Sequence, residues 1–261
     1  MSLISLAAAP PSGRSRPLII DDTDYATTVI GQGSSPPWTD IASLAGYFGQ
    51  VQALLNADAT WVDVQRWQRA QLDSRPDIVT DMGARSRAGY ALRTLLGDPE
   101  LVQQLVKAVA TVADTTRRRL ILRVPSPGTW LAWAHEVAGT PIEEIDADNA
   151  DGASMYVAEW LGQLGTLPVA AVVLDAVETP DGLTEALAEY TSITNVAQHF
   201  GWSVVMRYTD RVDTGTDTTI GILPAEFWSG GSAVPETDIV LTRIPAQANP
   251  EVVLDKLKHL A

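Results

Sequence analysis

The chain has 261 residues, a formal net charge of −14 at pH 7 and no cysteine. Without cysteine, the chemistries of disulfides, thiolate nucleophiles and cysteine-bound zinc or iron–sulfur clusters are excluded. The negative charge opposes binding to nucleic acid and to anionic membrane surfaces. No run approaches the roughly 18 apolar residues that a membrane span needs. We therefore expect a cytoplasmic protein with neither nucleic acid nor membrane as a partner.

The predicted elements follow one another as alternating strands and helices. Residues 1–16, rich in Ala, Pro, Ser and Gly, predict a flexible N-terminal arm, and residues 17–261 predict a single domain. Short aliphatic or β-branched runs predict strands at 17–21, 60–64, 77–81, 120–124, 170–175, 203–208, 219–223 and 238–242. Amphipathic patterns predict helices at 38–57, 99–116, 130–137, 153–164, 180–200 and 250–260.

This alternation predicts the α/β class and a (β/α)₈ TIM-type barrel with some irregular or missing elements. Four of the runs, within 120–124, 170–175, 203–208 and 238–242, have the continuous aliphatic character of strands buried on both faces. The run at 60–64 leaves an alternative open, because it also reads as the start of a helix that continues to Leu72.

Charged residues end most of the predicted strands, where the active site of a β/α barrel lies. These strand-end residues are Asp21, Asp22, Asp81, Arg123, Asp175, Arg207 and Arg243. Three guanidinium groups in an acidic protein favour a clamp for carboxylates, which arginine binds through two hydrogen bonds. Asp175 and Glu178 could handle protons or bind an N–H of the substrate. The alternative is that the arginines and aspartates pair with one another as a structural network.

The segment after Arg123 contains a glycine turn that opens a helix, so backbone N–H groups there could face an anionic group. Trp130 and Trp133 lie on one face of that helix and belong either to the core or to a substrate wall. Residues 31–38, GQGSSPPW, form either a lid or a simple connection. The three histidines are scattered without metal-ligand spacing, and no cofactor-binding motif follows a strand, so we expect neither a metal nor a cofactor. Mg²⁺ held by carboxylates of Asp21, Asp22, Asp81 and Asp175 is an alternative that no motif demands.

The part from about 101 to 245 resembles the uroporphyrinogen decarboxylase and cobalamin-independent methionine synthase superfamily of barrels. The resemblance rests on the order of VPSPGTWLA, VVLDAVET and GWSVVMRYTD, which are similar to three strand–loop units of that superfamily. Arg207 and Tyr208 stand where methyltransferase members place a zinc ligand, and the arginine-rich motif of the decarboxylases is missing between 17 and 38. The resemblance therefore implies the barrel and the position of the site, without the zinc chemistry.

Three functions are consistent with this sequence. The first is a metal-independent enzyme acting on a small carboxylate-bearing molecule, a lyase of decarboxylase type. In it Asp175 and Arg207 are catalytic, and the substrate is bound by Arg123, Trp130, Glu178, Tyr208, Arg243 and Asp21. The second is a methyl or alkyl transferase that uses a bound cofactor or a partner. The third is a non-catalytic barrel whose mouth is plugged, with Arg123, Arg207 and Asp175 paired to each other. For all three we expect a homodimer, the commonest assembly.

Overall fold

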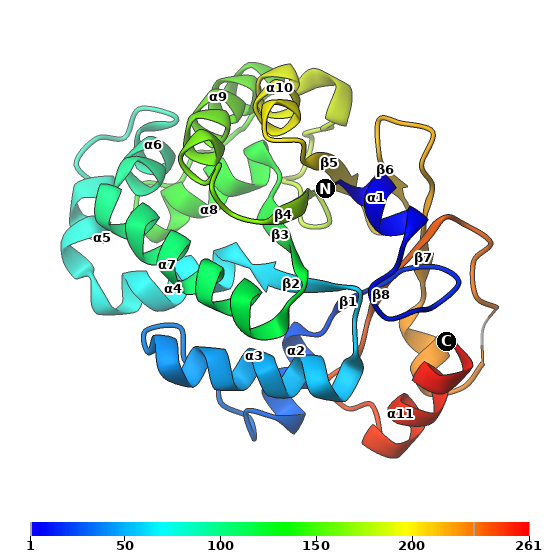
Figure 1. Cartoon of the computed structure of the whole chain (residues 1–261). Helices are drawn as coiled ribbons and strands as arrows, with labels where there is room; N and C mark the ends of the chain where they lie inside the picture. Colours follow the sequence, from blue (N-terminus) through cyan, green and yellow to red (C-terminus); the bar gives the residue numbers. More distant parts are fainter. Residues whose placement is uncertain (1, 232, 261) are drawn as a thin grey trace.

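The aliphatic runs form parallel strands at the centre of the molecule, as the computed structural model of residues 2–231 and 233–260 shows (Figure 1). The parallel strands are β1 (Leu18–Asp21), β2 (Ala59–Asp63), β3 (Arg119–Pro125), β4 (Val169–Asp175), β5 (Ser203–Arg207), β7 (Ile220–Leu223) and β8 (Ile239–Arg243). Every residue of β4 is buried, as expected for a strand covered on both faces. These strands confirm seven of the eight predicted runs.

The strands belong to two sheets with the orders β1-β8-β7 and β2-β3-β4-β5-β6. The sheets meet where β1 contacts β2, and there Asp58 accepts a hydrogen bond from the Leu18 N–H at 2.8 Å. All pairings are parallel except that of β5 with β6 (Val212–Asp213), which is antiparallel and only two residues long. The fold is thus α/β and mostly parallel, and a complete eight-stranded barrel ladder does not form within the described residues.

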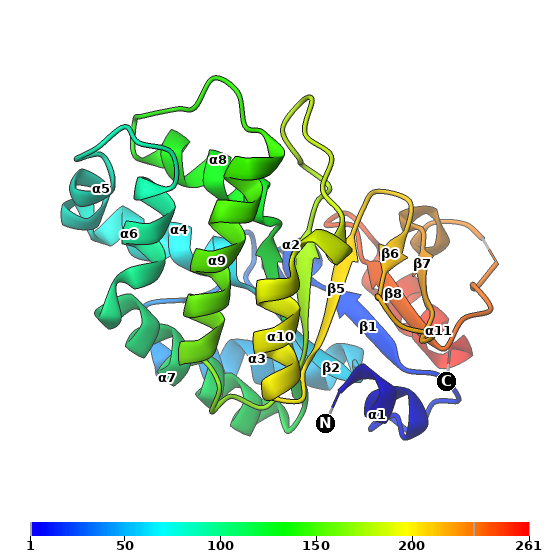
Figure 2. The same cartoon turned by 90° about the horizontal axis from the view of Figure 1, so that it is seen from above.

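Helices cover the strands unevenly. Those on the side of β2 to β5 are α4 (Val64–Ser74), α5 (Pro76–Met82), α6 (Tyr90–Gly97), α7 (Pro99–Thr116), α8 (Pro127–Val137), α9 (Ala147–Gln163) and α10 (Thr191–His199), as Figure 2 shows. The others are α1 (Leu3–Ala8), α2 (Thr23–Val29), α3 (Ile41–Leu55) and α11 (Pro250–His259), with short 3₁₀ helices η1 (Leu187–Glu189) and η2 (Ala225–Trp228). Across the described ranges, no helix has the length and apolarity that a membrane crossing requires.

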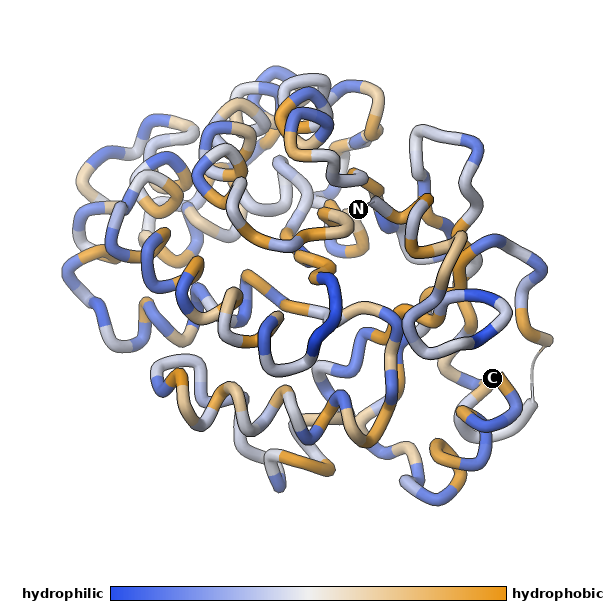
Figure 3. The backbone as a smooth tube through the Cα atoms, in the orientation of Figure 1, coloured by the Kyte–Doolittle hydropathy of each residue, from blue (hydrophilic) through white to orange (hydrophobic). Residues whose placement is uncertain are grey.

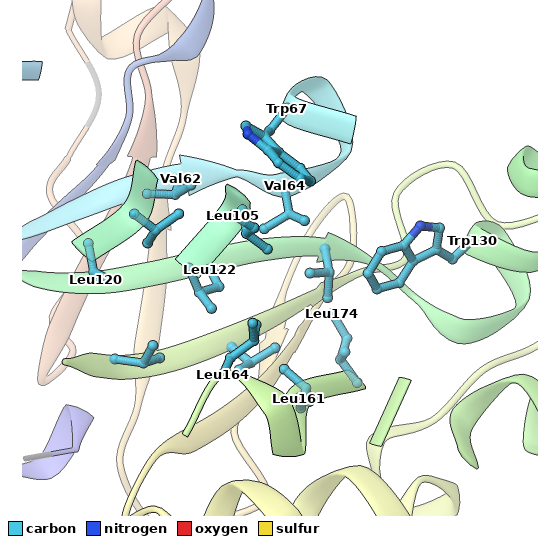
Figure 4. Close-up of a cluster of buried hydrophobic side chains, with 14 of the residues drawn as sticks. Val62, Val64, Trp67, Leu105, Leu120, Leu122, Trp130, Leu161, Leu164 and Leu174 are labelled. Carbon is cyan, nitrogen blue, oxygen red and sulfur yellow. The ribbon is translucent and has the colours of Figure 1, made fainter. Parts of the chain in front are cut away.

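Two apolar clusters hold the strands in place. The larger lies between strands and outer helices, where Leu105, Leu161 and Leu164 pack near Leu120 and Leu122 (Figure 4). The smaller lies among the strands themselves and consists of Leu3, Leu6, Ile19, Ala59, Trp61, Ile121, Ala170, Ala171, Val173, Val205, Ile239 and Leu241. Along the chain, hydrophobic and hydrophilic residues alternate in short stretches (Figure 3). Side chains fill the space among the strands, so a ligand has to bind at their ends.

The predicted strand at 77–81 is wrong, because residues 76–82 form α5. Pro76 occupies the first turn, where its missing N–H costs nothing. Ile78 and Met82, four residues apart, are buried on one face, whereas Asp81 is exposed. Asp81 is therefore on a helix surface and not at a strand end, which corrects its predicted place among the strand-end residues.

Two further segments differ from the prediction. The helix expected at 180–200 begins only at Thr191. Before it, the chain turns at Gly182, whose φ is +83°, and the side chain of Glu185 is buried. The stretch expected as a loose arm contains α1, in which Leu3 and Leu6 are buried against the strand interior. Helices α2 and α6 were not expected, because the sequence around them was assigned to loops. At 60–72 both alternatives are partly correct, since β2 ends at Asp63 and α4 begins directly after it.

Candidate functional site

A cavity of about 660 Å³ opens at the carboxyl ends of the strands. Its floor carries charged residues at or near strand ends, namely Asp21, Asp63, Arg123, Asp175 and Arg207, and Arg243 at the end of β8 lies at its edge. Its walls come from α4, from α8 and from the segments after β1 and β4, with Thr23, Ser35, Pro36, Trp38, Gln65, Arg66, Arg69, Ala70, Asp73, Trp133, Glu136, Val177 and Glu178. The location agrees with the prediction that a site lies where the loops after the strands converge.

Asp175 joins the two arginines at the centre of the floor. Its Oδ2 accepts from Arg123 Nε at 2.7 Å and from Arg207 Nη2 at 2.8 Å, and its Oδ1 accepts from Arg207 Nε at 3.1 Å. Burial alone would raise the pKa of Asp175, but the charges of Arg207 and Arg123 outweigh it and hold the pKa below its ordinary value. The carboxylate is therefore a weak base that fixes two guanidinium groups.

Two outer carboxylates complete this network. Arg123 Nη1 donates to Asp63 Oδ1 at 3.3 Å and to Gln65 Oε1 at 2.8 Å. Arg207 Nη1 donates to Asp21 Oδ2 at 3.2 Å, and its guanidinium carbon lies 5.6 Å from the ring centroid of Trp61. Within the part of the chain that is described, Arg123 Nη2 has no hydrogen-bond partner, so its N–H groups are left for a ligand.

A second carboxylate shared between arginines lies at the rim. Asp24 accepts from Arg66 and from Arg243, which reach it from α4 and from the end of β8. Burial would raise the pKa of Asp24, but the hydrogen bonds from these two arginines outweigh it and lower the pKa. The side chain of Arg243 is 57% exposed, so this pair belongs to the solvated edge of the cavity and not to its floor.

Two predicted substrate contacts lie outside the cavity lining. Trp130 is fully buried among apolar side chains (Figure 4), and its Nε1 donates to Gln68 Oε1 at 3.0 Å. Tyr208 donates its hydroxyl to the Glu185 carbonyl at 2.9 Å. In contrast, Trp133 does line the cavity, and so does Glu178, which is exposed. Trp130 therefore belongs to the core, and Trp133 belongs to the cavity wall.

The glycine turn at the start of α8 already faces an anion from the chain itself. Glu185 is 3% exposed, and its Oε1 accepts from the Gly128 N–H at 2.9 Å and from Tyr190 at 2.5 Å, while its Oε2 accepts from Ser126. A Cβ on Gly128 would lie 2.3 Å from Leu183 Cδ2. The close approach that glycine permits thus brings the loop after β4 onto the helix N-terminus.

No cluster of three or more His, Asp or Glu suited to a metal occurs in the ranges the structure describes. His135 is fully buried in α8, where burial lowers its pKa, and its Nδ1 lies 3.0 Å from the Thr140 carbonyl. Asp22, next to the lining residue Asp21, is not part of the lining. Burial and then the charge of Asp21 raise the pKa of Asp22.

The structure brings together Asp21, Arg123, Asp175, Glu178, Arg207 and Arg243 as expected, and adds lining residues that the sequence reading missed. Asp63 ends the β2 run as the other charged residues end theirs, so the same rule could have found it. Gln65 and Arg69 lie on α4, which the sequence predicted only as an alternative and without a role in the site. No family model, curated protein or solved structure matches the chain. The function therefore has to be argued from the cavity.

Proposed function

We propose that the cavity binds a small carboxylate-bearing molecule and that the chain is a metal-independent lyase acting on it. The observation that carries this proposal is the pair Arg123 and Arg207, which Asp175 holds in fixed orientation at the cavity floor. Guanidinium groups that are oriented before binding lose little entropy when they bind a carboxylate. The free Nη2 of Arg123 is the donor that would contact the ligand.

The reaction class we propose is loss of CO₂. The bond between the carboxylate carbon and its neighbour breaks, CO₂ leaves, and the electron pair stays on the neighbouring carbon, which then takes a proton from solvent water. Arg123 and Arg207 would orient the carboxylate, and the apolar surfaces of Trp38, Trp133 and Val177 would favour the loss of charge. Asp175 acts in this scheme as a positioning residue, because its lowered pKa suits it poorly to proton transfer.

The non-catalytic alternative is favoured by a specific observation. Arg123, Arg207 and Asp175 are paired with each other, which is the arrangement expected of a structural network. The mouth itself is not plugged, since the cavity of about 660 Å³ lies directly above this network. Its volume is within the range typical of small-molecule sites. No observation favours the transferase alternative over the lyase.

We also propose that the strands derive from a (β/α)₈ barrel in which the sixth parallel strand is replaced by the short β6. Neighbouring contacts run from β7 through β8 and β1 to β2, and β6 contacts β7, which supports this proposal. Kinship with the uroporphyrinogen decarboxylase and methionine synthase superfamily, a homodimer and a cytoplasmic location remain proposals that rest on the sequence.

Isothermal titration calorimetry with valerate, a plain monocarboxylate, tests the binding step. We compare the wild type with Arg123→Gln and with the control Arg75→Gln, whose arginine pairs with Asp77 and Glu100 outside the cavity. Loss of one charge-assisted contact should weaken binding by about tenfold in Arg123→Gln and leave the control unchanged. A wild type that binds no carboxylate, with both variants folded, would refute the proposal and favour the structural network.

The reaction is tested by measuring CO₂ released from a panel of β-keto carboxylates. Release that requires Arg123 would support the lyase. Binding without release from any member of the panel would reduce the proposal to a binding function and refute the reaction class.

A further inference from the structure

We propose that Arg69 is a second anchor for the ligand and that the ligand is therefore a dicarboxylate. This inference rests on the proposed function, because it takes the first carboxylate to be bound by Arg123 and Arg207. It adds the substrate class and a residue that determines specificity.

The arginines of the cavity differ in their partners. Four of the five lining guanidinium groups are ion-paired: Arg123 and Arg207 share Asp175, and Arg66 and Arg243 share Asp24. In the described chain, Arg69 has no carboxylate oxygen within 4.0 Å and no hydrogen bond. An unpaired cation in a cavity wall keeps all its N–H donors for a ligand.

Arg69 is exposed at the cavity wall, and its neighbour there is an aromatic ring and not a carboxylate. Its guanidinium carbon lies 6.0 Å from the ring centroid of Trp133, which is 7% exposed and lines the same cavity. A ring orients a guanidinium through its face and leaves the in-plane N–H groups unused. Trp133 therefore positions Arg69 without neutralising its charge.

The position of Arg69 along α4 determines how far it lies from Gln65 and therefore from the floor of the cavity. Gln65, in the first turn of α4, accepts from Arg123 Nη1 at 2.8 Å and so marks the floor. Arg69 comes four residues later, which puts it on the same helix face and about 6 Å further along the axis. A ligand with two carboxylates joined by a short spacer could reach both arginines within the cavity of about 660 Å³.

Asp73 follows one further turn along α4 and also lines the cavity. It is exposed and forms no ion pair with Arg69. Its negative charge weakens the field that Arg69 presents to a ligand, because the two side chains lie at (i, i+4) spacing on one helix. Removing this charge should therefore strengthen dicarboxylate binding.

Calorimetric titration with three probes of matched chain length tests the inference. Valerate has one carboxylate, glutarate has two, and δ-aminovalerate replaces the second carboxylate by an ammonium group. We expect the wild type to bind glutarate about tenfold more tightly than valerate. Arg69→Ala should abolish that preference with valerate binding unchanged, and Asp73→Asn should enlarge it.

The control is Arg93→Ala. Arg93 is exposed on α6, also lies 6.0 Å from an aromatic ring centroid, that of Tyr156, and does not line the cavity. Its removal should leave the preference for glutarate intact. Thermal unfolding of each variant checks that it is folded.

Two results would overturn this inference without refuting the proposed function. One is valerate binding that depends on Arg123 together with a glutarate preference that Arg69→Ala leaves unchanged. The other is tighter binding of δ-aminovalerate than of glutarate. It would show that exposed carboxylates of the cavity lining, such as Asp73 and Glu178, select a cation. Absence of valerate and glutarate binding to the wild type would instead refute the proposed function itself.

Discussion

Replacement of Asp175 by Asn is expected to destabilise the fold by about 3–5 kcal/mol, the usual cost of removing one partner from a buried ion pair. The variant keeps the shape of the side chain but loses the charge that two guanidinium groups share. Asp175 is 2% exposed, and the side chains of Arg123 and Arg207 are only 15% and 13% exposed. Water can therefore replace little of the lost interaction.

The outer carboxylates limit the loss. Arg123 keeps Asp63 at 3.3 Å, and Arg207 keeps Asp21 at 3.2 Å, so neither guanidinium becomes fully unpaired. The loss should therefore lie at the lower end of that range, about 3 kcal/mol. For a chain of this size, each 1 kcal/mol shifts the unfolding temperature by roughly 2 °C, so the expected decrease is roughly 6 °C. Thermal unfolding followed by circular dichroism measures it.

Asp210→Asn is the matched control, because Asp210 and its partner Arg211 are 78% and 63% exposed. Its unfolding temperature should stay at the wild-type value, since exposed pairs contribute little. If Asp175→Asn also unfolds at the wild-type temperature, the two arginines do not depend on this carboxylate, and the reasoning about a fixed clamp is refuted.

The difference between wild type and Asp175→Asn should also depend on pH. Because the folded pKa of Asp175 lies below its ordinary value, its contribution to stability is complete above about pH 4, the unfolded pKa, and decreases as pH falls through the folded pKa. Urea unfolding between neutral and strongly acidic pH should show the two proteins converging at the acid end. A difference that stays constant over this range would contradict the lowered pKa.

Two packing predictions concern other parts of the fold. Gly83→Ala, after α5, should lower the unfolding free energy by about 1–3 kcal/mol, because the new Cβ would lie 2.7 Å from the Ala138 backbone carbonyl oxygen. Gly152→Ala, with open space around it, should not lower it, and equal unfolding curves for the two variants would disprove the close approach. Leu6→Ala in α1 should cost about 2–5 kcal/mol in chemical unfolding. Ile4→Ala on the same helix, where Ile4 is 60% exposed, should cost little, and similar losses for both would show that α1 is not docked.

The strands could be predicted from the sequence where apolar character alone decides the structure. The run ending at Asp175 is buried at every residue, and its short length and its valines favour a strand over a helix. The run at 77–81 failed because β-branched residues also occur in helices once tertiary contacts favour a helical face, here through Ile78 and Met82. The spacing of four between those two residues was the available signal.

The candidate site was predictable for the residues that strands position and not for those that helices position. Arg207 ends β5 directly opposite Asp175 in the strand register, and Arg123 lies on the neighbouring β3, two residues before the position opposite Asp175. Gln65, Arg69 and the division between Trp130 and Trp133 depend on how α4 packs against α8, which no local pattern in the sequence encodes. The sequence allowed the ion pairs of Arg123 and Arg207 with Asp175 only as one alternative, because it does not give the distances between these side chains.

Helix α1 has a consequence for synthesis on the ribosome. Its two buried leucines, Leu3 and Leu6, pack in the smaller apolar cluster, among side chains of the strands. The Leu3 N–H also donates to Ser203 Oγ on β5, 200 positions away in sequence. At roughly 5–20 residues per second, β5 emerges roughly 10–40 s after α1. During that interval α1 lacks the part of its docking surface that β5 supplies, so its apolar face stays partly exposed to chaperones and to premature self-association until β5 has emerged.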